Sequence, residues 1–210
     1  LCYTGYMKYA VLLRGINVGK NISIKMTDLK YAVEEAGFKN VKTYIQSGNV
    51  VFESLEEDLL KIESTLQHKL RNAFKFDSGI VVLTYEQLKR ALIEAPADWP
   101  KRDDLRRYIA FMIRPLLVKD VMLEVELREE VDSVKEGKDV FYMSTLLSGL
   151  TRSRFPKLIS RAVYKSITIR SYDTTQKNSC SYGKRIKKYG HKRNPGKKHS
   201  FQFKGIPVYH

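Results

Sequence analysis

Short apolar runs and amphipathic stretches alternate along this chain, and they predict strands and helices in an order that occurs twice. In the first half, the apolar run 8–14 is typical of a buried strand, and apolar residues at i, i+3, i+4 and i+7 from Leu29 predict a helix. Runs of β-branched and aromatic residues flank Ser47-Gly48-Asn49 and predict a hairpin. A helix, a strand and a further helix ending at Pro96 follow. Residues 7–96 are therefore predicted to form a βαββαβα unit.

The same order starts again after the polar segment 97–106, which we interpret as a linker. Residues 107–177 are predicted to form a second βαββαβ unit, with its strands and helices at 107–113, 117–125, 131–134, 140–143, 155–163 and 167–170. Asp173-Thr174 could cap a last helix, but the apolar period ends after Thr175. We therefore expect no helix there and a disordered basic tail over 178–210.

A βαββαβ order most simply forms the split βαβ, or ferredoxin-like, arrangement of an antiparallel sheet with two helices on one face. The predicted fold class is thus α+β, with two ferredoxin-like subdomains. Each sheet would leave its other face uncovered, and the two copies could cover that face for each other or for a partner chain.

Two capping boxes mark predicted helix starts, one at Ser54-Leu55-Glu56-Glu57 and the other at Thr84-Tyr85-Glu86-Gln87. In such a box the hydroxyl and the acidic or amide side chain satisfy each other's backbone N–H groups.

Charge and cysteine content narrow the classes of function. The formal net charge is +15, but ten Lys and Arg and no acidic residue follow Asp173. The first 173 residues therefore hold 28 basic and 23 acidic residues, a net charge of +5. Cys2 and Cys180 are the only cysteines, so we expect neither a disulfide framework nor a metal site, and a reducing cytoplasm as the location. No apolar run is long enough to span a membrane.

The loop Arg14-Gly15-Ile16-Asn17-Val18-Gly19-Lys20 leaves the first predicted strand and leads towards a helix. Glycines at such a position let backbone N–H groups approach an anion, and the two cationic side chains add positive charge. The loop is not a Walker A sequence, because its spacing is one residue short and Asn21 replaces the magnesium-binding Ser/Thr. The simpler interpretation, which we favour for the glycines, is that they supply positive φ for a tight exit from the strand.

Topology brings a second polar segment to this loop. In a ferredoxin-like sheet the third strand lies beside the first, so the turn Gln46-Ser47-Gly48-Asn49 should emerge at the same end as the loop. The predicted ligand-binding cluster contains Arg14, Gly15, Asn17, Gly19, Lys20, Gln46, Ser47, Gly48 and Asn49. Hairpin chemistry alone also explains Ser-Gly-Asn, because Gly and Asn tolerate positive φ.

The residues LLRGINVG, then KM-x-(D/E)-L at a helix start, then TYIQSGNVVFES, closely resemble the bacterial domain-of-unknown-function family 1697. The resemblance covers roughly residues 7–177 and continues in Ser153-Arg154 and Thr168-Ile169-Arg170, which suggests a second cluster of Ser153, Arg154 and Arg170. This chain departs from the family at Gly19-Lys20, where two glycines are usual, and at Arg170-Ser171-Tyr172, where Arg-Asn-Trp is common. The resemblance implies a fold of two α+β units and brings no established activity.

The sequence is compatible with three alternative functions. The first is a module that binds a small anionic or polar ligand at the loop and the turn. The second is nucleic-acid binding, with Tyr9 and Phe52 as stacking residues on the central strands and the basic tail as a non-specific contact. The third is an enzyme in which Arg14, Asn17, Gln46 and Arg170 bind an oxyanion, although no nucleophile or general base is evident and no cofactor is expected.

Overall fold

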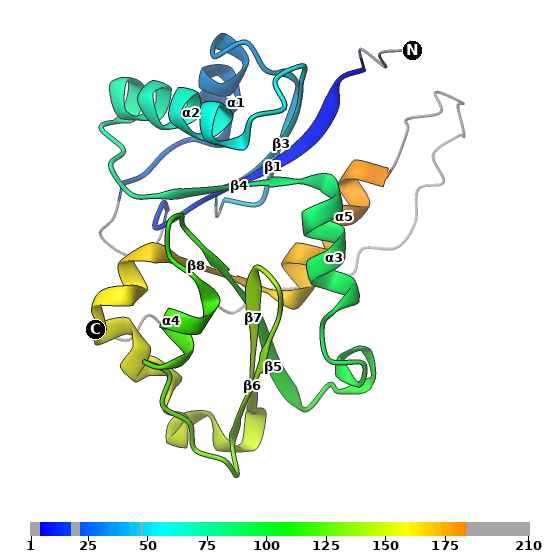
Figure 1. Ribbon diagram of the computed structural model, residues 1–210, viewed down its shortest axis with the longest axis vertical. Helices are drawn as coiled ribbons and strands as arrows, with labels where there is room; N and C mark the ends of the chain where they lie inside the picture. The colour runs from blue at the N-terminus through cyan, green and yellow to red at the C-terminus, as the bar shows by residue number, and fades with distance from the viewer. Residues whose placement is uncertain (1–4, 18–21, 47, 184–210) are drawn as a thin grey trace, which may run out of the picture.

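The protein, described here by a computed structural model, contains two units that each hold a four-stranded antiparallel sheet (Figure 1). The structure describes residues 5–17, 22–46 and 48–183. The first unit consists of β1 (Met7–Leu13), α1 (Met26–Glu35), β2 (Lys39–Tyr44), β3 (Asn49–Ser54), α2 (Leu59–Phe74), β4 (Ile80–Thr84) and α3 (Tyr85–Ile93). The second consists of β5 (Leu105–Met112), α4 (Val118–Met122), β6 (Asp132–Glu136), β7 (Val140–Leu146), β8 (Ile167–Ser171) and α5 (Tyr172–Gly183).

Both sheets have the same topology. Their strand orders are β2-β3-β1-β4 and β6-β7-β5-β8, with every neighbouring pair antiparallel. The two predicted ferredoxin-like units are therefore confirmed, including the position of β3 beside β1. No helix in the described part of the chain is long and apolar enough to cross a bilayer.

The first sheet is buried on both faces. Because side chains alternate along a strand, Tyr9 and Val11 of β1 pack beneath α1 and α2, whereas Ala10 and Leu12 face the second unit. Those two residues join a core with Ile109 and other residues of the second sheet, and α3 lies alongside α5 (Figure 1). The continuous apolar run of β1 thus reflects burial on both sides.

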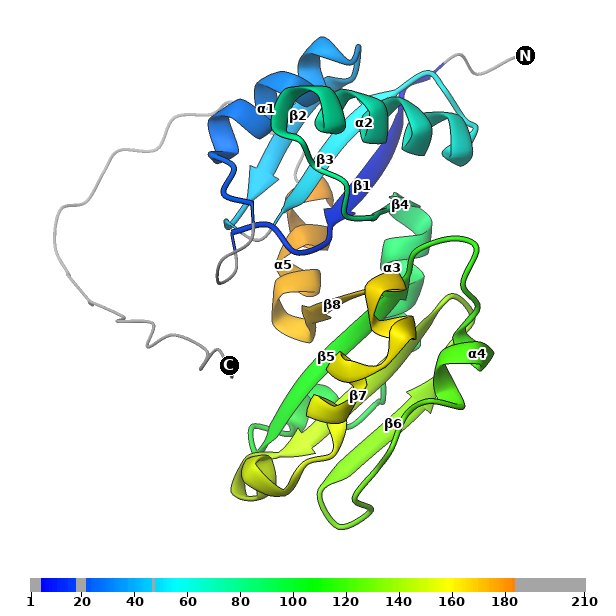
Figure 2. The same ribbon diagram turned by 90° about the vertical axis from the view of Figure 1, so that its left-hand side faces the viewer.

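The second unit covers the open face of the first sheet. Each unit therefore buries one sheet face of the other, as the sequence predicts. The far face of the second sheet has its own cover, formed by α4 and by the 3-10 helices η2 (Leu147–Arg152), η3 (Phe155–Ser160) and η4 (Ala162–Ser166), the yellow segment of Figure 2. The protein is therefore built in layers, with helices outside both sheets and one apolar core between them.

The segment between the units packs into this shared core. It contains a 3-10 helix, η1 (Trp99–Lys101), and Trp99 is 2% exposed. The Trp99 ring lies edge-on to the rings of Tyr142 and Tyr172, at centroid distances of 5.8 and 5.3 Å. One tryptophan therefore ties residues 97–106 to both β7 and α5.

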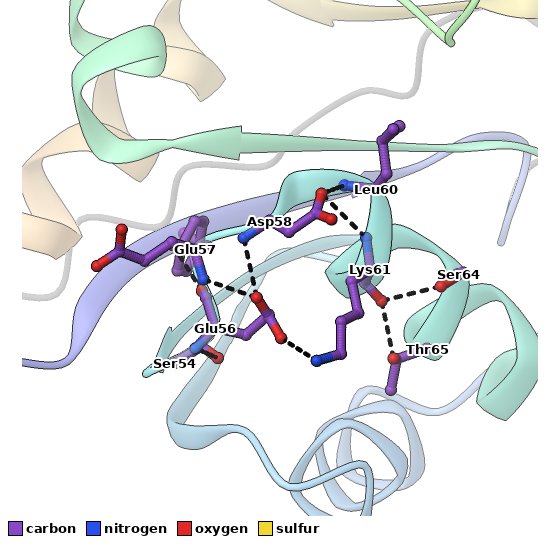
Figure 3. Close-up of polar contacts among 9 residues, drawn as sticks. Ser54, Glu56, Glu57, Asp58, Leu60, Lys61, Ser64 and Thr65 are labelled. Atoms are coloured by element: carbon purple, nitrogen blue, oxygen red, sulfur yellow. Dashed lines mark hydrogen bonds and ion pairs between the residues drawn. The ribbon is translucent and has the colours of Figure 1, made fainter.

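The predicted capping box at Ser54 is wrong, because α2 begins four residues later and Asp58 is its N-cap (Figure 3). The Asp58 carboxylate accepts hydrogen bonds from the backbone N–H groups of Leu60 and Lys61, at 2.9 and 3.4 Å. Glu56 instead accepts from the N–H groups of Glu57 and Asp58, so it shapes the approach to the helix. The second box is confirmed, with Thr84 and Gln87 bonded reciprocally.

Two further predictions about the second unit are wrong. The apolar stripe at 155–163 forms the short helices η3 and η4 instead of one α-helix, and Ile159 is exposed. The chain after Thr175 stays helical to Gly183 in α5, which packs against α3 and begins where the Ser171 hydroxyl accepts the N–H of Thr174. Tertiary packing, not an apolar period within the segment, therefore accounts for α5. The predicted tail beyond residue 183 lies outside the described residues.

Candidate functional site

The loop after β1 and the turn before β3 meet at one end of the first sheet. The backbone N–H of Leu13 donates to the carbonyl of Gly48 at 2.8 Å. The side-chain amide of Asn17 donates to the carbonyl of Gln46 at 2.9 Å. Predicted residues from both segments therefore lie together, as the strand order requires.

At two of the predicted positions, the backbone conformation requires glycine. Gly15 and Gly48 have φ of 68° and 72°, which L side chains rarely adopt. A Cβ at Gly48 would lie 2.9 Å from the Cβ of Leu13 and equally close to the Ile16 side chain. A larger residue at position 48 would thus disturb folding, so a Gly48→Val variant would not separate binding from folding.

Asn17 holds the loop in shape. Its side-chain oxygen accepts the N–H of Ile24 at 2.8 Å, and its amide donates to the Ile24 carbonyl at 2.9 Å in addition to its bond to Gln46. Its φ of 55° is tolerated well by asparagine. Ile45 in the neighbouring turn has φ of 49°, which is unusual for a β-branched side chain.

Arg170 of the second unit reaches into this end of the first sheet. Its Nε donates to the Oδ1 of buried Asn49 at 2.8 Å, and Nη2 donates to the Leu13 carbonyl at 2.7 Å. Nη1 donates to Thr168 and to the Ile169 carbonyl. Burial lowers the pKa of the Arg170 guanidinium to about 10, which leaves it charged at neutral pH.

Arg14 makes the reciprocal contact from the first unit to the second. Its Nε lies 3.3 Å from the carbonyl of Tyr164 and 3.2 Å from that of Ile167, and its guanidinium lies over the Tyr164 ring at 5.1 Å. Within the described chain, no acceptor lies at hydrogen-bonding distance from its two Nη groups. Arg14 therefore retains donors that a ligand could use.

The suggested second cluster divides between two places. Arg170 lies at the junction just described, whereas Ser153 and Arg154 both contact the buried carboxylate of Asp132. The Ser153 hydroxyl donates to Oδ1 at 2.6 Å, and the Arg154 backbone N–H donates to Oδ2 at 2.7 Å. These two residues anchor η3 to β6.

Other predicted features are placed as follows. Gly19, Lys20 and Ser47 lie outside the described residues. Tyr9 and Phe52 are buried beneath α1 and α2, with ring centroids 5.7 Å apart, so neither can stack on a base. Among the described residues no group of three His, Cys, Asp or Glu is placed to hold a metal ion.

Sequence reasoning missed the link between the units. The contact of Arg170 with Asn49 joins residues 121 positions apart, and that of Arg14 with Tyr164 joins residues 150 apart. No local pattern encodes such pairs. The family resemblance marked Thr168-Ile169-Arg170, and the enzyme hypothesis grouped Arg170 with Arg14, but neither identified Asn49 as the partner of Arg170.

The fold and this junction define a protein of two ferredoxin-like units joined by two arginines, Arg14 and Arg170, that each reach from one unit to the other. The family described as "Protein of unknown function (DUF1697)" matches residues 7–142, and the chain belongs to that family. Its structure is similar to that of the conserved bacterial protein SP0830 from Streptococcus pneumoniae, with 28% identity and a TM-score of 0.77, over 86% of this chain and 100% of that one. Another solved structure, TA0507, is 15% identical with a TM-score of 0.24, which is too low to inform the fold. No curated protein matches the chain.

Proposed function

We propose that this protein binds a small anionic or polar ligand at the junction of the Arg14–Lys20 loop and the Gln46–Asn49 turn. The observation that carries the proposal is the hydrogen bonding of the Arg14 guanidinium. Its guanidinium is positioned by two carbonyls through Nε, and its Nη groups have no acceptor in the described chain. A preoriented guanidinium of this kind suits a carboxylate or phosphate oxygen pair.

Neighbouring groups support this assignment. Gln46 is exposed, and its side-chain amide has no hydrogen-bond partner among the described residues. The charge of Arg170 adds a positive field at the same end of the sheet. The unusual φ of Ile45 is the kind of backbone strain found at functional sites. The ligand would contact Arg14 and Gln46, while Asn17, Gly48 and Asn49 maintain the shape of the site.

Ligand-dependent stabilisation tests the proposal, with inorganic pyrophosphate as the probe and sodium chloride at matched ionic strength as the reference. At a hundred times the Kd, a ligand that binds only the folded state stabilises it by about 2.7 kcal/mol, which a thermal-unfolding measurement detects. We expect Arg14→Gln to remove most of this stabilisation. The matched control is Lys42→Gln, which removes one exposed charge from β2.

Two outcomes contradict the proposal. One is equal stabilisation by pyrophosphate and by sodium chloride, which would show that only ionic strength acts. The other is an equal response of the Arg14→Gln and Lys42→Gln proteins, which would show that net charge, and not this site, attracts the anion.

A further inference from the structure

A largely apolar pocket of about 260 Å³ is lined by residues of the second sheet and of the 3-10 helices η2, η3 and η4 that cover its far face. Its floor comes from β5 and β7, where Arg106 is paired with Thr145 and Tyr108 with Met143. Since residues two apart on a strand share a face, the two β5 side chains stand side by side on this floor.

The polar groups of the floor differ in what they can offer a ligand. The hydroxyls of Thr145 and Ser153 both donate to Asp132, at 3.0 and 2.6 Å, so their protons are already used. Arg106 lies beside the Tyr108 hydroxyl, and burial raises the pKa of this phenol, which keeps it a neutral donor. Arg106 hydrogen-bonds with the Tyr108 hydroxyl, and among the described residues no carboxylate forms an ion pair with it.

Asp132 contacts the Thr145 and Ser153 hydroxyls of this pocket but forms no salt bridge with Arg106. Its carboxylate already accepts hydrogen bonds from two hydroxyls and from the backbone N–H groups of Arg128 and Arg154. The floor therefore offers one phenolic O–H and one guanidinium that has no ion-pair partner among the described residues.

The walls of the pocket are apolar. They include Leu150, Phe155, Leu158 and Ile169, with the Tyr164 ring on the η4 side. A cavity of about 150 Å³ lined by such residues accommodates a benzene molecule. The larger volume here suits one ring with a short acidic side chain.

We propose that this pocket binds a small organic carboxylate with an apolar body, its carboxylate on Arg106 and Tyr108 and its body against the walls. A single cation balances a single negative charge, so a carboxylate fits better than a phosphate monoester, which carries up to two. The binding groups proposed here, Arg106 and Tyr108, differ from those of the junction, although Arg14 lies over the Tyr164 ring that forms one wall of this pocket.

The test uses 3-phenylpropanoate as the probe and its neutral amide as the reference, with binding measured calorimetrically on the full chain. The acid is expected to bind at least tenfold more tightly than the amide. Arg106→Gln is expected to weaken binding of the acid about 10- to 100-fold, because a hydrogen bond to a charged group is lost. Arg152→Gln, which removes an exposed charge from η2, should have no effect.

Tyr108→Phe provides a second variant that keeps the ring and removes only the hydroxyl, with a smaller expected loss of affinity. Arg14→Gln should weaken binding of the acid much less than Arg106→Gln does, because Arg14 contacts only the Tyr164 wall of this pocket. The proposal is overturned if acid and amide bind equally, if Arg106→Gln and Arg152→Gln weaken binding to the same extent, or if Arg14→Gln weakens binding as much as Arg106→Gln does.

Discussion

At the scale of single residues, Asp132 shows how one buried carboxylate can hold several segments together. It is 4% exposed, and it accepts hydrogen bonds from Thr145 on β7, from Ser153 and Arg154 before η3, and from the backbone N–H of Arg128. A buried charge is tolerated when it is this fully hydrogen-bonded. The covering segment of the second sheet therefore depends on this side chain.

Asp132→Ala is expected to lower the free energy of unfolding by about 3 kcal/mol or more, because one buried and three partly buried donors lose their acceptor. Urea unfolding followed by circular dichroism measures the change. Asp139→Ala is the control, since Asp139 forms an exposed pair with Arg90 and should contribute less than about 1 kcal/mol. Equal losses in the two variants would contradict this role for Asp132.

At the scale of elements, the start of α2 depends on Asp58. Its side chain satisfies two of the N–H groups that every helix N-terminus leaves unpaired.

We predict that Asp58→Ala lowers the free energy of unfolding by about 1 kcal/mol. Glu57→Ala, at an exposed position just before the cap, should change it by less than about 0.5 kcal/mol. Denaturant unfolding of both variants measures the difference, and a larger effect at Glu57 than at Asp58 would mean that the helix is capped elsewhere.

Element order was predictable because it follows from periods within single segments. The ends of helices were harder to predict. Ser54 and Asp58 are both residue types that cap helices well, and which of them caps α2 depends on the hydrogen bonds of Glu56 with the backbone N–H groups that follow it. The stripe at 155–163 fits a helix by period, yet it forms 3-10 turns over the second sheet.

The loop and turn of the candidate site could be placed together from strand order. The arginine contacts between the units could not, since they depend on how the sheets pack.

At the scale of the whole molecule, the two units share one apolar core. Residues of both sheets and Trp99 belong to the same cluster, and the Tyr142 hydroxyl donates to the carbonyl of Ala91 across it. Arg114 also pairs with Glu63 of α2 at 3.0 Å. Neither sheet could lose its partner without exposing one apolar face.

The units are therefore expected to unfold in one cooperative transition. Trp99 is the only tryptophan and lies in the shared core, so its fluorescence reports separation of the units. Fluorescence and far-ultraviolet circular dichroism should give the same urea midpoint. An earlier fluorescence midpoint would show that the units separate before they unfold.

The central claim is that the junction of the two units binds a small anion, and ¹H–¹⁵N spectra recorded during a pyrophosphate titration at constant ionic strength test it most directly. The account predicts saturable shifts at the Arg14 side chain and at the amides of Gly48 and Asn49, and their loss in the Arg14→Gln protein. Shifts spread over exposed lysines, or no saturable shift at these positions, would contradict it.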